Sequence, residues 1–201
     1  MTVSPYAKHR PSQWPSITRK LVEVHPLNPD EIVEVVLLSW QSIFDSRFGT
    51  AGSRIGKDIF PKPQIMGFLL HELIPLELQS RHPQDWRGDE ASGEKDLVCL
   101  IDERFSVEVK TSSNPSHIYG NRSYAQQTSS GKKGKTGYYL AVNFGKFAKG
   151  GSGTRQPSIR LIRFGWLDSS DWIGQVSPTG QQARLSPQVE RGKLLQLYPA
   201  T

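Results

Sequence analysis

The stretch "GEKDLVCLIDERFSVEVKTSS", residues 93–113, decides the fold of this chain. Two apolar runs flank the polar residues 102–104, and this pattern predicts a buried β-hairpin with its turn at those residues. Asp96 stands at the head of the first run, and Glu108 and Lys110 lie within the second. A buried, unpaired charge costs several kcal/mol. Chemistry is one reason for a protein to accept that cost, so the hairpin also bears on function.

The register of the hairpin determines whether these charges meet. Side chains alternate between the two faces of a strand, so Glu108 and Lys110 point to the same face. With a three-residue loop at 102–104, Val98 lies opposite Glu108 and Asp96 lies opposite Lys110, which places all three charges on one face. A two-residue loop would send Asp96 to the other face. The sequence therefore permits a convergent acid–acid–lysine cluster.

Such a cluster has a defined chemistry. Carboxylates from Asp96 and Glu108 can bind Mg²⁺, which prefers oxygen ligands and retains several waters. The main-chain carbonyl of Val109 offers a further ligand, and Lys110 can orient a water or stabilise charge that develops on a phosphate. These roles together amount to metal-assisted phosphodiester hydrolysis. The alternative is a solvated surface patch, because Glu-x-Lys is common on half-exposed strands.

Composition limits the class of protein. The 201 residues favour one domain large enough to bury a core, with the Pro-rich residues 1–27 as an irregular N-terminal arm. A net charge of +6 favours a polyanionic partner such as nucleic acid. The lone Cys99 excludes a disulfide framework and a thiolate zinc site. Without a signal-like or membrane-spanning apolar run, we expect an intracellular, cytoplasmic protein with no membrane partner.

The remaining pattern predicts an α/β or α+β fold, with a mixed β-sheet flanked by helices. Asn28 suits the N-cap of a helix over 28–48, and Pro29 suits its first position. A second helix over 64–80 runs at least to Ile74, where Pro75 kinks or stops it. A short helix over 114–127 has Asn114 or Ser116 as its cap. Beyond the hairpin, strands are predicted at 138–147, 158–168 and 193–198.

Two segments after the hairpin are candidates for DNA contact. Asn and Gln can read adenine bidentately, and Arg can read guanine or hold a phosphate. The short helix carries residues of these types together with tyrosines that could instead be core anchors; the candidates are Asn121, Arg122, Tyr124 and Gln126. In the Gly/Ser-rich loop that follows, phosphate contacts are expected from Lys132, Lys133 and Lys135, although a solvated loop would look the same.

The spacing D-x11-E-V-K from Asp96 to Lys110 resembles the PD-(D/E)XK nuclease superfamily. Asp96 matches the metal-binding acid, Glu108 the second acid and Lys110 the catalytic lysine. Lys95 replaces the usual proline, and the nearby "GDE" offers rival acids in a loop. Within the superfamily, "VEVKTSSNPSHIYGNRSYAQ" followed by "KTGYYLAVNF" resembles the ScaI family of type II restriction endonucleases, over residues 60–198.

The resemblance implies a restriction-endonuclease-like core, dependence on Mg²⁺ with Mn²⁺ as a substitute, and a homodimer that cuts double-stranded DNA at a short palindromic site. It also suggests Glu72, on the second helix, as a third active-site acid, although an ordinary exposed glutamate is the alternative. It places Gln126 near the active site. Two other functions remain open: a DNA repair or junction-resolving nuclease of the same fold, and a non-catalytic DNA-binding protein.

Overall fold

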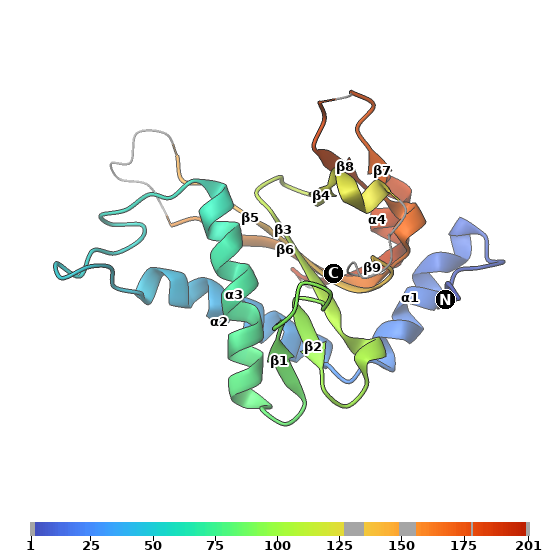
Figure 1. Cartoon of the computed structure of the whole chain (residues 1–201), viewed down its shortest axis with the longest axis horizontal. Coiled ribbons are helices and arrows are strands. Elements are labelled where there is room, and N and C mark those ends of the chain that lie inside the picture. The colour runs from blue at the N-terminus through green and yellow to red at the C-terminus, as the bar shows by residue number, and fades with distance from the viewer. Residues whose placement is uncertain (1–2, 127–134, 149–155, 178, 200–201) are drawn as a thin grey trace.

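The computed structural model describes residues 3–126, 135–148, 156–177 and 179–199. Its centre is a six-stranded sheet in the order β1–β2–β3–β5–β6–β9 (Figure 1). The strands are β1 (Trp86–Gly88), β2 (Leu97–Cys99), β3 (Val107–Ser112), β5 (Gly137–Phe144), β6 (Ile159–Leu167) and β9 (Leu194–Tyr198). Only β3 and β5 run parallel, and every other pair of neighbours is antiparallel. The predicted mixed sheet and α+β class are confirmed.

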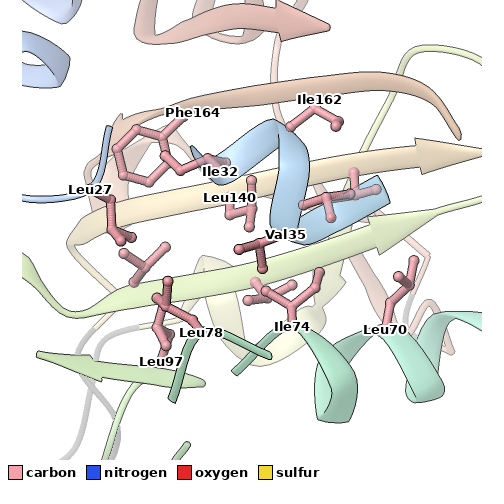
Figure 2. Close-up of a cluster of buried hydrophobic side chains, with 14 of the residues drawn as sticks. Leu27, Ile32, Val35, Leu70, Ile74, Leu78, Leu97, Leu140, Ile162 and Phe164 are labelled. Carbon is pink, nitrogen blue, oxygen red and sulfur yellow. The ribbon is translucent and has the colours of Figure 1, made fainter. Parts of the chain in front are cut away.

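Two long helices, α2 (Pro29–Asp45) and α3 (Pro63–Arg81), pack on one face of this sheet. Figure 2 shows Ile32 and Val35 of α2 among side chains of the sheet such as Leu140, and Ile74 of α3 belongs to the same buried cluster. Each fully buried side chain of this kind contributes about 1.5–3 kcal/mol. No helix in the described ranges is long and apolar enough to cross a bilayer.

Local chemistry explains where both helices begin and end. The Asn28 side chain accepts a hydrogen bond of 2.8 Å from the Asp30 amide, so the predicted N-cap of α2 is confirmed. Of the two effects expected at Pro75, a kink or a stop, the stop is wrong, because α3 continues to Arg81 and covers the predicted range 64–80. The buried stripe carried by Ile74 and Leu78 runs across the proline, and its packing against the core outweighs the hydrogen bond that proline cannot make.

The predicted short helix over 114–127 is also wrong. The Asn114 side chain accepts hydrogen bonds from the Ser116 and His117 amides, which makes a turn. The chain then forms strand β4 (Tyr119–Asn121) and a 3₁₀ turn (Arg122–Ala125). Strand β4 joins a small sheet in the order β4–β8–β7, which packs over the other face of the large sheet (Figure 1). The other two strands of the small sheet are β7 (Ile173–Gly174) and β8 (Gln182–Arg184).

The N-terminal segment is more regular than its proline content predicts. Helix α1 (Trp14–Glu23) lies within the segment expected to be an irregular arm. Thr18, on its inner face, donates a hydrogen bond of 2.7 Å to the carbonyl of Gly192 in α4 (Pro187–Lys193). Strand β1 and helix α4 were likewise not anticipated, because both are short and owe their structure to tertiary partners.

A buried ion cluster ties α4 to the end of β6. The Lys193 ammonium lies 2.8 Å from carboxylate oxygens of both Asp168 and Asp171. Lys193 is only 4% exposed, and Asp168 is 7% exposed. Burial raises the pKa of Asp171, and the hydrogen bond from Lys193 opposes that rise. The lysine therefore compensates two acids in a place where water cannot.

Removal of this lysine charge should destabilise the fold. We expect Lys193→Met to lower the free energy of unfolding by about 3–5 kcal/mol, because two buried acids lose their counter-ion. Urea denaturation measures the change, and Lys57→Met at an exposed lysine is the matched control. A loss below about 1 kcal/mol for Lys193→Met would show that the cluster contributes little to the stability of the fold.

Candidate active site

The observed hairpin differs from the predicted one in register and not in face. Leu97 pairs with Val107, and the same register brings Asp96 opposite Glu108 instead of Lys110. The connection over residues 100–106 is longer than a three-residue loop and contains a 3₁₀ turn over 103–105. A displacement by two residues leaves every side chain on its original face. The three charges therefore share one face, as in the three-residue-loop alternative, but Asp96 has a different cross-strand partner.

The carboxylate of Asp96 is fixed by the neighbouring strand. Its Oδ2 accepts a hydrogen bond of 2.7 Å from the main-chain amide of Val109. The Nδ1 atom of His71, on α3, lies 3.7 Å from the same oxygen. The Asp96 side chain is 18% exposed, so it is fixed in orientation and still reachable from solvent.

Glu108 is the most deeply buried charge of the site, at 2% exposure. Its Oε1 accepts a hydrogen bond of 2.6 Å from the Lys110 ammonium and another from the Tyr124 hydroxyl. Its Oε2 lies 3.9 Å from the Lys95 ammonium. Lys110 also donates to the Val109 carbonyl at 3.1 Å. Two ammonium groups and a phenol thus compensate a charge that would be costly to bury alone.

Lys95 acquires a structural explanation in this arrangement. It occupies the position where the superfamily motif usually has proline, and the sequence alone suggested only a departure from the pattern. Its side chain is 13% exposed, and its ammonium lies 5.1 Å from the centre of the Tyr139 ring. The departure from the motif therefore places a second cation beside Glu108, and that departure was the only signal in the sequence.

Tyr124 lies in the site, although its sequence context suggested a contact with DNA. Its ring packs against Trp172 at 5.0 Å, and the ammonium groups of Lys110 and Lys135 lie 4.9 and 5.2 Å from the ring centre. Burial, and then the negative charge of Glu108, raise the pKa of the phenol. The hydroxyl therefore stays protonated at ordinary pH and remains a donor to Glu108.

Helix α3 presents a different side chain to the site from the one expected. Glu72 is exposed, and the α3 residue beside Asp96 is His71. Histidine was not singled out because its neighbours in the sequence show no zinc or triad spacing. Its proximity to Asp96 comes from the packing of α3 against the sheet, which no local pattern specifies.

The residues expected to bind DNA fall into three groups. Asn121 and Gln126 are exposed, on β4 and just beyond the 3₁₀ turn. Arg122 donates to the main-chain carbonyls of Ser177 and Gly180, at 3.3 and 3.2 Å, so it braces the connection between β7 and β8. Lys132 and Lys133 lie outside the described residues, and Lys135 stands near Tyr124.

The site fits a hard divalent cation. Two carboxylates and the carbonyl of Val109 offer oxygen only, which suits Mg²⁺ because that ion keeps several waters and needs few protein ligands. Among the described residues, no group of three His, Cys, Asp or Glu side chains is arranged to hold a metal. The described residues therefore contain no zinc site built from three or more such side chains. The two carboxylates of Asp96 and Glu108 form an open site instead, in which water would complete the coordination of the metal.

A mixed sheet with an acid–acid–lysine cluster on adjacent strands defines a nuclease of the PD-(D/E)XK superfamily. The family model described as ScaI restriction endonuclease matches residues 4–198. The type II restriction enzyme ScaI of Streptomyces caespitosus is 50% identical over 196 residues, which cover 97% of this chain and 85% of the relative. The chain therefore belongs to the ScaI restriction endonuclease family and is a type II restriction endonuclease. Of the functions left open by the sequence, family membership favours this one.

The Tyr124 contact generates a prediction about catalysis. Tyr124→Phe keeps the ring and removes only the donor to Glu108. Because a hydrogen bond to a charged group is worth about 1.5–3 kcal/mol, we expect cleavage to slow by about 10- to 150-fold while DNA affinity is retained. The control is Tyr138→Phe, whose hydroxyl donates to the Leu21 carbonyl within the main apolar cluster instead. Single-turnover cleavage measures both variants, and equal rates for Tyr124→Phe and wild type would contradict the assigned role.

Proposed function

We propose that this restriction endonuclease hydrolyses both strands of a short palindromic DNA site, with Mg²⁺, or Mn²⁺ in its place, held by Asp96, Glu108 and the carbonyl of Val109. The shared face of the two carboxylates beside Lys110 is the observation that carries the proposal. Residues 1–201 are taken as one nuclease domain, since both apolar clusters pack on the same large sheet. We propose that the enzyme acts in the prokaryotic cytoplasm, where it would encounter incoming DNA.

The residues of the site divide the chemistry among them. A bound Mg²⁺ would polarise the phosphodiester and lower the pKa of a coordinated water. Lys110 already touches both Glu108 and the Val109 carbonyl, so its ammonium is placed to orient a water or to stabilise charge on the phosphate. The amide of Val109 and the hydroxyl of Tyr124 keep the two carboxylates oriented. Glu72, being exposed, is an accessory candidate only.

DNA contacts are proposed on the segments beside this site. Asn121 and Gln126 offer amide groups for base edges, and Arg122 offers a cation. Lys132, Lys133 and Lys135 are proposed as phosphate contacts, with support from the position of Lys135 near the catalytic face.

A two-fold dimer is proposed because a palindrome presents two equivalent phosphodiesters and the described chain carries one acid–acid–lysine cluster. We expect two protomers per specific duplex in analytical ultracentrifugation. One protomer on a fully cleavable duplex would contradict this stoichiometry.

The catalytic assignment predicts a separation of binding from cleavage. We expect Asp96→Ala, Glu108→Ala and Lys110→Ala each to abolish cleavage while specific DNA binding survives, because the cluster serves the metal and water. Glu72→Ala should have a milder effect and serves as an acidic control on the adjacent helix. Plasmid digestion and a binding assay measure the two properties, and wild-type cutting by Glu108→Ala would refute the assignment.

The oxygen-only ligand set predicts the metal requirement. Cleavage should need Mg²⁺ or Mn²⁺ and should stop in EDTA. Ca²⁺ should support binding without cleavage, since it is larger and activates water poorly. Digests across these ions give the comparison, with a commercial restriction digest as the control for DNA quality. Robust cutting in EDTA would be inconsistent with any metal-assisted mechanism.

A further inference from the structure

The small sheet β4–β8–β7 has two chemically different faces. Gly120 and Ala183 point inward to the second apolar cluster, around Tyr139 and Trp172. Because side chains alternate along a strand, the residues on either side of this pair point outward. Pairing places Tyr119 opposite Arg184 and Asn121 opposite Gln182. The outer face is therefore a compact block of one aromatic, two amide and one guanidinium side chain, with opposite residues about 5 Å apart.

This block has the chemistry of base recognition. Asn and Gln can pair bidentately with adenine, and Arg can pair bidentately with guanine. In the described part of the chain, the side chains of Asn121, Gln182 and Arg184 are exposed, and their polar groups make no hydrogen bond within the protein. None of the three short strands contains an acidic residue. The face thus presents donors and acceptors to a partner, with no carboxylate to repel a nucleic acid.

The block also lies beside the catalytic cluster. A Cβ at Gly120 would stand 2.9 Å from the Tyr124 ring, so β4 rests directly on the side chain that donates to Glu108. Asn121 and Tyr124 are three residues apart, which limits the chain between them to about 11 Å. A hollow of about 950 Å³ is lined by Tyr119 and Gln182 of the block and by His71, which lies 3.7 Å from Asp96.

We propose that the outer face of the small sheet enters the major groove of the substrate and that Gln182 and Arg184, with Asn121, read base edges there. The major groove admits a short antiparallel β-ribbon, and its base pairs differ in donor and acceptor pattern. The inference rests on the proposed cleavage of a specific duplex and adds the surface that selects it. If the scissile phosphate lies at Asp96 and Glu108, the neighbouring base pairs lie over β4 and β8.

The test begins with the wild-type enzyme, whose cleavage site is mapped by sequencing the ends of digested plasmid. An absence of discrete fragments would defeat the proposed function itself, before the recognition surface is addressed. Dissociation constants are then measured with Ca²⁺ for the mapped duplex and for a random duplex of equal length. The variants are Gln182→Ala and Arg184→Ala, with exposed Gln79→Ala on α3 and Arg160→Ala on β6 as matched controls.

We expect each recognition variant to weaken binding to the mapped duplex by about 5- to 150-fold and to leave binding to the random duplex unchanged. The controls should match wild type on both. Unchanged random binding and an unchanged melting temperature also show that a variant is folded. An equal loss on both duplexes would mean phosphate contact alone, and no loss would mean a solvated face; either result overturns the proposal.

A base-analogue experiment sharpens the assignment of Arg184. Replacement of guanines in the mapped site by 7-deazaguanine removes the N7 acceptor that an arginine would use. The analogue should weaken binding by wild type at one guanine position and should cause no further loss in Arg184→Ala at that position. The same penalty in both proteins at every position would overturn guanine reading by Arg184.

Discussion

The buried carboxylate of Glu108 is the constraint on which the rest of the site depends. At 2% exposure it needs donors and counter-charges: Lys110 and the Tyr124 hydroxyl both donate to its Oε1, and the Lys95 ammonium lies 3.9 Å from its Oε2. Hydrogen bonds and ion pairs to this carboxylate are stronger than they would be in water, because few water molecules surround it. Two of the groups that make this burial tolerable, Lys110 and Tyr124, are also the ones to which the proposed mechanism assigns roles in cleavage.

In the proposed mechanism, one side chain connects the recognition surface to the catalytic cluster. Tyr124 packs beneath β4 at Gly120 and donates to Glu108. A shift of the small sheet on DNA binding would therefore move Tyr124 and change its hydrogen bond to Glu108 directly. On the opposite face of the large sheet, α2 and α3 bury the main apolar cluster, which packs beneath β3 and β5. Strands supported in this way, with a smaller sheet above them, suit an enzyme that must place one phosphodiester accurately.

Much of this arrangement could be predicted from local sequence. The helix that begins after Asn28, the central strands, and the shared face of Glu108 and Lys110 follow from capping and alternation. The sequence only permitted Asp96 to join that face, because its side depended on the length of the hairpin loop. The exact hairpin register could not be predicted, because residues 100–106 form a longer connection whose 3₁₀ turn depends on its own side-chain bonds.

The small sheet and the supporting residues could not be predicted for a different reason. Strands of two or three residues carry too little periodicity to identify, and β4 pairs with β8, which lies far along the chain. The positions of His71, Lys95 and Tyr124 around the two carboxylates arise from tertiary packing. Only the replacement of the usual proline by Lys95 marked one of them in advance.

The most direct test of the central claim is a crystal structure of the enzyme on its mapped duplex with Ca²⁺. The account predicts a cation bound by Asp96, Glu108 and the Val109 carbonyl, with the scissile phosphate beside Lys110. The account would be contradicted if other residues held the cation and the phosphate. In that case Glu108 would still contact Lys110 and Tyr124 but would contact neither the cation nor the phosphate.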